Sequence, residues 1–356
     1  MGVPQNMARV LVIGAGFSGS VAAERLASAG HKVLVRDKRS HIGGNAYDYR
    51  DSHGVQVHKY GPHLFHTNSE KVFEYLSRFT EWISYEQRTL SCVDGVLYQI
   101  PINLTTLEKF FGRKVDISTL VETRDKIVTS EDVCLSRVGR VLTDQFFRGY
   151  TRKQWGLDLS ELDASVAGRI PVRDNTDDRY FTDKFQVMPK DGYYALFSRM
   201  LDHPNIRVEL EKSFMGIEGW DLVVYTGSLD EYFSCCYGRL PYRSLEFQHE
   251  YYEVESFQSA SIINYPGLEP YTRIVEYKKI TGQMHSGTTV VKEMPKSEGE
   301  PFYPVPNAKN EELCQRYIAL SQRERKVLFL GRLAQYKYFN MDQVIAAALK
   351  KVEFYL

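Results

Sequence analysis

The sequence of 356 residues lacks several features that mark particular classes of protein. No apolar run approaches the roughly 18 residues that a membrane-spanning helix needs, and no long apolar segment precedes the first predicted strand, so we expect no signal peptide. The 45 basic and 45 acidic side chains cancel, which leaves no bulk charge for nucleic-acid binding. Internal repeats and low-complexity tracts are missing as well. We therefore expect neither a nucleic-acid partner nor a membrane partner.

Cysteine is scarce, and its spacing is uninformative for metals. The five cysteines are odd in number and form neither a CxxC pair nor a metal-binding pattern. A bridge between the adjacent Cys235 and Cys236 would be strained, so the pattern favours reduced thiols in a cytoplasmic protein. His58, His63 and His66 do not have a usual zinc spacing, and no carboxylate or thiol completes a site. We expect no metal.

The clearest motif lies near the N-terminus. An apolar run leads into a GxGxxG turn, a helical stretch, a second apolar run and an acid, which is the order of a dinucleotide-binding βαβ unit. Such glycines permit a tight turn, close approach of a pyrophosphate and close helix packing, and the helix start offers free N–H groups. The alternative is a tight turn without a ligand. The residues are Val10–Ile13, Gly14, Gly16, Ser18, Gly19, Val33–Val35 and Asp37.

The residues after the second run distinguish between cofactors. Asp37 is placed to accept hydrogen bonds from a ribose, Lys38 lies in a basic cluster that suits phosphate, and Gly43-Gly44-Asn45 follow five residues after the acid. Where NAD enzymes normally continue into a helix, a Gly-Gly pair lets the backbone pass close to a second part of a long ligand. The pattern resembles the large FAD family typified by glutathione reductase and the amine oxidases, so we favour FAD over NAD.

The remaining sequence predicts further elements by periodicity and turn signals. The length and the 43% hydrophobic content suit two or three domains. The expected elements are a helix at 71–79 capped by Asn68 or Ser69, a hairpin at 84–102 around Asp94-Gly95, a helical insertion from about 105 to 165, loop composition at 166–190, a helix and strand at 191–210, buried strands at 220–227 and 327–332, an antiparallel sheet at 240–295, and a terminal helix at 341–354.

Seven blocks resemble the bacterial-type UDP-galactopyranose mutase family, over nearly the whole chain and in the same order. The blocks are HKYGPHLFHTN (58–68), GYTRKQWG (149–156), RIPVR (169–173), DDRYF (177–181), PYTRIVEYK (270–278), PFYPVPN (301–307) and GRLAQYKYFNMDQVIAAAL (331–349). The resemblance implies interconversion of UDP-galactopyranose and UDP-galactofuranose for cell-wall or polysaccharide synthesis. It also implies reduced FAD, whose N5 forms a covalent adduct with the sugar while UDP departs, in a redox-neutral reaction. Bacterial members are typically homodimers.

We therefore predict an α/β fold with an FAD-binding Rossmann-like domain, an inserted helical domain and an antiparallel β-sheet domain. The expected FAD domain is discontinuous. The boundaries are 1–84, 190–230 and 310–356 for the FAD domain, 105–165 for the helical substrate domain, and 85–104, 166–189 and 231–309 for the sheet domain, with a mobile loop near 166–178.

The resemblance also assigns roles. Arg169 and Arg273 match arginines that hold the diphosphate, where a guanidinium fork suits phosphate oxygens, and His63 matches a histidine near the flavin N5. Taken singly, each residue has a structural alternative, such as a solvated arginine or a packed aromatic. The expected substrate-binding residues are Gln87, Tyr150, Thr151, Trp155, Tyr180, Arg243, Asn264, Tyr303 and Tyr338. The expected cofactor-binding residues are Gly14, Gly16, Ser18, Gly19, Asp37, Lys38, Gly43, Gly44, Asn45, His63, Leu64, Arg332, Asn340, Met341, Asp342 and Gln343.

The terminal helix has an electrostatic role in this picture, because its positive N-terminus would stabilise negative charge on the reduced flavin. Four positions depart from the family pattern. Gln87 stands where many members carry Asn, Asn340 where some carry Asp, and Phe185 and Phe302 replace frequent tyrosines. Three alternatives therefore stay open: the same chemistry on another nucleotide sugar, such as UDP-N-acetylgalactosamine or a deoxy-sugar nucleotide; an FAD-dependent oxidoreductase; and a catalytically silent flavoprotein that binds a partner.

Overall fold

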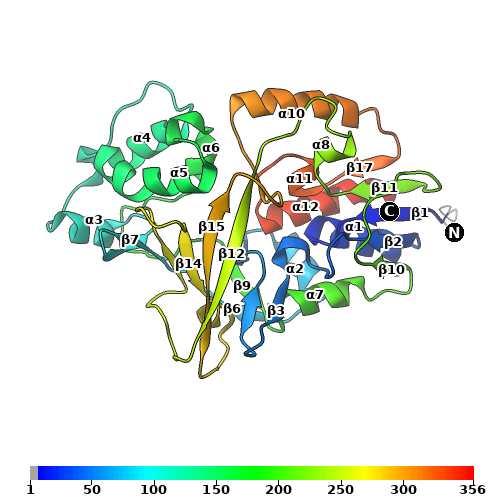
Figure 1. Cartoon of the computed structure of the whole chain (residues 1–356), viewed down its shortest axis with the longest axis horizontal. Coiled ribbons are helices and arrows are strands. Elements are labelled where there is room, and N and C mark those ends of the chain that lie inside the picture. The colour runs from blue at the N-terminus through cyan, green and yellow to red at the C-terminus, as the bar shows by residue number, and fades with distance from the viewer. Residues whose placement is uncertain (1–6) are drawn as a thin grey trace.

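The computed structural model describes residues 7–356, which are built around a five-stranded parallel sheet and a seven-stranded mixed sheet (Figure 1). Both ends of the described chain lie beside the parallel sheet, and the helical insertion lies at the opposite end of the molecule. The parallel sheet has the order β10-β2-β1-β11-β17. Its strands are β10 (Ile206–Glu209), β2 (Lys32–Arg36), β1 (Arg9–Ile13), β11 (Leu222–Tyr225) and β17 (Val327–Phe329).

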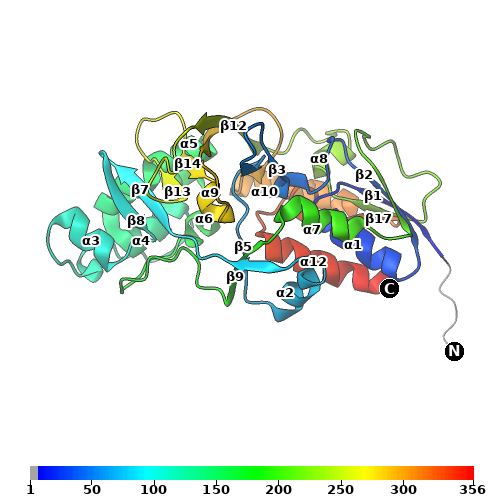
Figure 2. The same cartoon turned by 90° about the horizontal axis from the view of Figure 1, so that it is seen from below.

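Apolar side chains cover both faces of this sheet, as the uninterrupted apolar runs predict. Val10 and Val12 pack with the helices of one face, whereas Leu11 packs with Val223 and Val327 on the other. Figure 2 shows three helices side by side along the first face. They are α1 (Phe17–Ser28), α7 (Gly192–Leu201) and α12 (Met341–Val352). The predicted helix-strand order at 191–210 and the terminal helix are confirmed.

Two glycines of the motif are required by close packing. A Cβ on Gly19 would lie 1.8 Å from the carbonyl oxygen of Gly14, so only glycine lets α1 approach the turn. Gly44 has φ +56°, and a Cβ there would lie 2.7 Å from Cα of Gly16. The Gly-Gly pair therefore packs against the first glycine turn itself. The sequence argument, which placed a ligand at this approach, missed that backbone contact.

Two small sheets and a helix follow the βαβ unit. The strands are β3 (Asp48–Arg50) paired with β4 (Gln56–His58), and β5 (Phe65–Thr67), β9 (Phe185–Pro189) and β6 (Trp82–Ser84) in the order β5-β9-β6. Helix α2 (Glu70–Ser77) begins after Ser69, whose side chain accepts from the Val72 N–H, so the predicted cap is confirmed. The loop predicted over 166–190 is wrong at its end, because residues 185–189 form a strand with distant partners.

The seven-stranded sheet has the order β16-β12-β15-β14-β13-β7-β8 and contains the predicted hairpin at Asp94-Gly95. It is antiparallel except for the parallel pair β13–β7, which departs from the prediction. A parallel pair is possible because the helical insertion and the strands β8 to β12 separate β7 from β13 in the chain, which gives the connection enough length to cross over. The strands are β16 (Tyr303–Pro304), β12 (Tyr242–Tyr252), β15 (Thr288–Lys296), β14 (Arg273–Glu276), β13 (Ile262–Asn264), β7 (Thr89–Val93) and β8 (Val96–Ile100).

The insertion is less helical than predicted. Residues 112–129 contain only a short 3-10 turn at Ile117–Thr119. Gly139 kinks α4 with φ +75°, and a Cβ there would lie 1.9 Å from the carbonyl oxygen of Leu120. A π-helical turn at Thr143–Arg148 joins α4 to α5. The helices are α3 (Leu104–Phe111), α4 (Ser130–Leu142), α5 (Gly149–Trp155) and α6 (Ala164–Gly168). They pack on Tyr98, Ile100 and Ile102 at the end of the β7–β8 hairpin.

The other helices are short apart from α10. They are α8 (Leu229–Tyr232), α9 (Lys278–Thr281), α10 (Ala308–Ser321) and α11 (Gly331–Ala334), with 3-10 turns at Gly44–Ala46, Leu159–Glu161 and Glu353–Tyr355. None of the helices in residues 7–356 combines the length and apolar character that crossing a membrane requires. All five cysteines are unpaired, in line with the free thiols expected.

Candidate functional site

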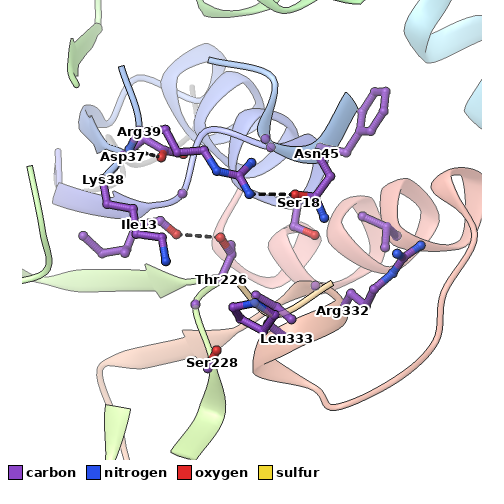
Figure 3. A pocket seen from close by; sticks show the side chains of 18 of the residues that line it. Ile13, Ser18, Asp37, Lys38, Arg39, Asn45, Thr226, Ser228, Arg332 and Leu333 are labelled. Atoms are coloured by element: carbon purple, nitrogen blue, oxygen red, sulfur yellow. Dashed lines mark hydrogen bonds between the residues drawn. The ribbon is translucent and has the colours of Figure 1, made fainter. Parts of the chain in front are cut away.

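A cavity of about 450 Å³ lies at the carboxyl ends of β1, β2 and β11. Figure 3 shows Asp37, Lys38 and Arg39 on one side of it and Arg332 on the other. The predicted cofactor residues that line it are Gly14, Gly16, Ser18, Asp37, Lys38, Gly43, Gly44, Asn45, His63, Arg332, Asn340 and Met341. Gly19, Leu64, Asp342 and Gln343 do not line it. The cavity therefore brings the N-terminal motif together with residues more than 300 positions later in the chain.

The polar groups at the motif end suit a dinucleotide. Gly16 caps α1 in an extended conformation without a side chain, so the first N–H groups of the helix face the turn unshielded. Asp37 is buried, and its two carboxylate oxygens accept from the N–H groups of Ala15 and Arg39, both at 2.8 Å. A carboxylate has about four acceptor positions, so two are left for ribose hydroxyls.

The start of α12 forms another wall of the cavity. Asn340 caps the helix, and its N–H donates to Oε1 of Gln343 at 2.9 Å. The Gln343 side chain therefore closes the cap, which is a structural use, and its contact with the cofactor stays a prediction. Asp342 accepts from Thr67 Oγ1 at 3.1 Å, while its other carboxylate oxygen is buried and has no hydrogen-bond partner in the described part of the chain. That end of the helix combines a positive dipole with an unsatisfied acceptor.

The three histidines of 58–66 have separate environments. His58 is buried and its Nδ1 accepts from the His63 N–H at 3.0 Å, while His63 Nδ1 donates to the Gly61 carbonyl at 2.9 Å. Burial lowers the pKa of each to about 3, so both are neutral near pH 7. The hydrogen bond of His63 leaves its Nε2 as an acceptor. His66 pairs with Asp183, and no metal-binding group of three or more such side chains occurs in residues 7–356.

Arg273 stands on strand β14 against a buried carboxylate. Its Nε donates to Oε2 of Glu293 at 2.7 Å, and the Glu293 side chain is 1% exposed. Burial alone would lower the pKa of Arg273, but Glu293 raises it well above its ordinary value. The second oxygen of Glu293 has no hydrogen-bond partner among residues 7–356. Arg273 is therefore charged, and the carboxylate of Glu293 largely balances its charge.

Tyr150, Tyr180 and Tyr303 lie near this arginine, and Trp155 and Tyr338 pack with Tyr303. The rings of Trp155, Tyr303 and Tyr338 lie 5.4–6.2 Å apart in tilted or edge-to-face pairs. Burial raises the pKa of Tyr150 to about 12, and Arg273 opposes that shift. Burial and the neighbouring Tyr338 also raise the pKa of Tyr180, against the effect of Arg273 and Arg169. Tyr150 and Tyr180 are thus neutral hydrogen-bond donors near pH 7.

Two further arginines lie over one of these rings. The guanidinium carbons of Arg169 and Arg332 are 3.9 and 5.3 Å from the centre of the Tyr338 ring. Arg169 also donates to the Tyr338 carbonyl and to Asn340 Oδ1, and Arg332 donates to the Phe339 carbonyl at 2.6 Å. Neither has a carboxylate within ion-pair distance among residues 7–356, so two uncompensated positive charges face this cluster.

His63 and Arg332 connect the cavity to the cluster. Both line the cavity, the positive charges of Arg332 and Arg273 contribute to the low pKa of His63, and Arg332 lies over Tyr303 at 5.5 Å. The cavity and the cluster of arginines and tyrosines are therefore adjacent, with His63 and Arg332 between them.

Four predicted substrate residues have other surroundings. The buried amide of Gln87 bonds to Tyr85, Ser261, Thr89 and the Arg88 carbonyl, which uses its donors and acceptors and favours a structural role over the predicted contact. Arg243 donates to the carbonyls of Lys153 and Gln154, so it caps α5 instead of facing the cluster. Asn264 is paired in register with Arg273, and Thr151 is buried on α5.

Sequence reasoning missed several residues that shape the site. Glu293 looks like an ordinary strand residue, and only the fold shows its pairing with Arg273. Glu300 reaches the cavity from the β15–β16 connection and accepts from Arg39 at 2.6 and 3.0 Å. The basic pair Lys38-Arg39 was the one available signal for this contact. Further lining residues are Lys212, Ser213, Phe214, Thr226 and Ser228.

Sequence comparisons agree with this layout. A family model described as UDP-galactopyranose mutase matches residues 145–338, and one described as an NAD(P)-binding Rossmann-like domain matches residues 12–79. A Klebsiella pneumoniae protein named probable UDP-galactopyranose mutase is 40% identical over 367 residues, covering 99% of this chain and 95% of that protein. The dTDP-fucopyranose mutase of Escherichia coli is 37% identical over 372 residues, with 98% and 99% covered.

A structural comparison extends the likeness to the fold. A crystal structure of reduced UDP-galactopyranose mutase superposes with a TM-score of 0.82 over 99% of this chain and 94% of that one, at 14% identity. At that identity the likeness concerns the fold.

Proposed function

Because this chain belongs to the UDP-galactopyranose mutase family, we propose that it interconverts the pyranose and furanose forms of UDP-galactose with reduced FAD as cofactor. One observation carries the proposal. The dinucleotide cavity meets, at His63 and Arg332, a group of arginines and neutral tyrosines that suits a diphosphate. A redox enzyme with an apolar substrate would have no use for uncompensated guanidinium groups beside its flavin.

The residues of the cavity fit FAD. Glycine at 16 and 44 keeps side chains out of the turn, α1 offers N–H groups to a pyrophosphate, and Asp37 keeps two acceptor positions for a ribose. The N-terminus of α12 would stabilise negative charge on the reduced ring. When bound, the reduced flavin supplies the nucleophile that takes up the sugar during ring exchange, so that no net oxidation occurs.

The cluster holds the departing nucleotide. Arg169 and Arg273 donate to the diphosphate, with Arg332 adding positive charge, because guanidinium groups bind phosphate oxygens in pairs. Tyr180 and Tyr303 donate hydrogen bonds without adding charge. In this arrangement the leaving UDP is stabilised while the sugar is detached, and it stays in place to receive the sugar again.

Aromatic faces on α5 hold the base. Trp155 packs beside Tyr303 and Tyr338, and Tyr150 lies near Arg273, so a uracil stacked on this side places its diphosphate among the arginines. His63, neutral and with Nε2 as an acceptor, binds at the cofactor side of the sugar without repelling a cationic intermediate state of the sugar ring.

The test uses protein reduced with dithionite and supplied with UDP-galactofuranose. Formation of UDP-galactopyranose without net flavin oxidation supports the proposal. Absence of conversion, with oxygen-linked oxidation of another substrate, would favour an oxidoreductase instead. A flavin-loaded protein that turns over neither would be a binding protein.

A second candidate is the same ring exchange on a 6-deoxy sugar carried by dTDP. It is favoured by the 37% identical relative named dTDP-fucopyranose mutase, which this chain matches from end to end. A panel of UDP-galactofuranose, dTDP-fucofuranose and UDP-N-acetylgalactosamine, compared by kcat/KM under reducing conditions, separates these substrates.

Two further parts of the proposal come from the family resemblance: a homodimer and a location in the cytoplasm. Sedimentation of the purified protein over a range of concentrations tests the first, with a single monomeric species as the contrary result. Fractionation of the source cells tests the second.

A further inference from the structure

Lys153 has an unusual environment for a lysine on a short helix. Its Nζ donates to the carbonyls of Tyr265, Glu269 and Tyr271 at 2.5, 3.0 and 3.0 Å. An ammonium group has three donors, and all three are used here. The side chain is 19% exposed, and burial lowers its pKa despite the nearby Glu269. A surface lysine that merely aids solubility would not be ordered in this way.

The three carbonyls belong to one turn with a role in the site. This turn, residues 265–272, connects β13 to β14, and its two ends carry Asn264 and Arg273, which are paired in register. A lysine ammonium suits such a ring of carbonyls because its donors point in three directions, whereas the planar fork of arginine does not. Lys153 therefore holds the backbone from which Arg273 projects.

Lys153 itself lies between the predicted base-binding residues of α5. Tyr150 and Thr151 precede it and Trp155 follows it on the same helix. The helix also approaches the turn closely, because a Cβ on Gly149 would lie 2.1 Å from the carbonyl oxygen of Pro266. Two independent features thus dock α5 onto the 265–272 turn.

The C-terminal end of α5 is held by Arg243. It reaches from β12 to the carbonyls of Gln154 and Lys153 at 2.9 and 3.2 Å, where a cation complements the helix C-terminus. Arg243 is paired in register with Tyr303 of β16. The short helix is therefore fixed by cation–carbonyl contacts to two strands that each neighbour a residue of the cluster.

We propose that Lys153 is a positioning residue that sets the spacing between the base-binding face of α5 and the diphosphate-binding Arg273. The inference rests on the proposed function, because it concerns how the nucleotide of the substrate is held. Without the ammonium group, α5 and the 265–272 turn are no longer held at a fixed distance and orientation. Each half of the site stays intact, but the two no longer match a single rigid nucleotide.

The experiment compares the binding of the complete nucleotide UDP with the binding of its separate parts to the flavin-loaded enzyme. Calorimetry measures the binding of UDP, of uridine and of inorganic pyrophosphate to the wild type, to Lys153→Met and to Lys126→Met. Lys126 is an exposed lysine of the same helical insertion and serves as the matched control. We expect Lys153→Met to weaken UDP about tenfold and to leave uridine and pyrophosphate within about twofold, while Lys126→Met changes none of them.

Turnover gives a second readout. We expect Lys153→Met to raise KM for UDP-galactofuranose about tenfold with kcat lowered less than about threefold, because the reacting groups are untouched. Should that variant not fold, Gly149→Ala tests the same docking without removing a charge, since its methyl group must displace the turn. The same pattern, weaker UDP and unchanged fragments, is expected.

Three results are decisive. Unchanged UDP affinity in both variants would overturn the inference. Loss of a fragment to the same extent as UDP would also overturn it, because it would mean that one half of the site had collapsed. If the wild type itself binds no UDP, the proposed function fails, and that outcome is distinct from a failure of the role given to Lys153.

Discussion

Arg273 and Arg169 both lie near Tyr180, but they stand in regions of the molecule that are built differently. Arg273 projects from a strand paired on both sides, and Glu293 holds it from a fully buried position. Arg169 follows the five-residue helix α6, is exposed, and contacts the segment 338–340 through a ring, a carbonyl and an amide. Arg273 and Arg169 together form the predicted diphosphate clamp. Arg273, its rigid half, is thus fixed in the sheet, whereas the contacts of Arg169 are ones that an anion can replace.

The two arginines also differ in net charge at the site. The carboxylate of Glu293 balances Arg273, so this residue chiefly supplies a fixed direction for hydrogen bonds. Arg169 keeps its full charge and supplies attraction. The proposed reaction, in which a dianionic group leaves and returns, would benefit from both properties, because rigid donors fix the geometry and a free charge favours the separated state. Substitutions at the two positions should therefore fail in different ways.

The largest effect is expected for Arg273→Ala. Activity should fall by about a thousandfold or more, and the protein should lose about 3–5 kcal/mol of stability because Glu293 is left buried without a partner. Turnover and urea unfolding measure the two losses. The double variant Arg273→Met with Glu293→Leu is the control: it should recover most of the stability and none of the activity. If Arg273→Ala kept the stability of the wild type, Arg273 would not be a structural part of the sheet.

A smaller effect, confined to activity, is expected for Arg169→Ala. Turnover should fall by about a hundredfold, with FAD retained and stability within about 0.5 kcal/mol of the wild type, as is usual for exposed positions. Arg169→Lys should lie between the two, because lysine keeps the charge and loses the paired donors. Near-normal turnover of Arg169→Ala would remove this residue from the diphosphate clamp.

The difference between the regions also explains what the sequence could predict. The glycine turn, the cap at Ser69, the hairpin at Asp94-Gly95 and the terminal helix are encoded within short stretches, and the structure has all of them. Their signals are local hydrogen bonds, turn preferences and periodicity. The cavity is built largely from such elements, and most of the predicted cofactor residues line it.

The parts that were missed depend on distant partners. Residues 185–189 look like a loop, since charges and prolines surround them, yet they pair with β5 and β6, which lie about 100 residues earlier in the chain. The role of Glu293 arises only from its register opposite Arg273. Gln87 was placed at the substrate by resemblance, but its buried amide is satisfied by its neighbours. Periodicity carries no information about such contacts.

Low pH should destabilise the rigid, sheet-built region through its buried histidines. Burial lowers the pKa of His58 to about 3 from an ordinary 6.5, so the folded state binds fewer protons than the unfolded state between these values. This contribution to stability is complete above pH 6.5 and is lost as the pH falls towards 3. We expect wild-type unfolding free energy to drop by a few kcal/mol from pH 7 to 4.

The matched comparison for this pH effect is His58→Gln against His53→Gln, since His53 is an exposed histidine. Urea unfolding at several pH values should show a shallower decline for His58→Gln and the wild-type decline for His53→Gln. Parallel curves for all three proteins would mean that His58 is not held neutral in the fold.

The smallest expected effect concerns the segment that carries Arg169. Residues 172–175 are attached to the β8–α3 connection, where the Arg173 N–H donates to Ile102 at 2.9 Å and the Asn175 carbonyl accepts from Leu104 at 3.0 Å. Arg169 itself lies outside that attachment, so the part of 166–178 that moves should be its first turn.

If only the closed form binds UDP, trypsin cleavage after Arg169 should slow about tenfold when UDP is present at ten times its Kd. Cleavage after Arg323, in the exposed loop that follows α10, should not change. Equal protection at both sites would indicate a general stabilisation of the fold, and unchanged cleavage at Arg169 would mean that both arginines are fixed before the substrate arrives.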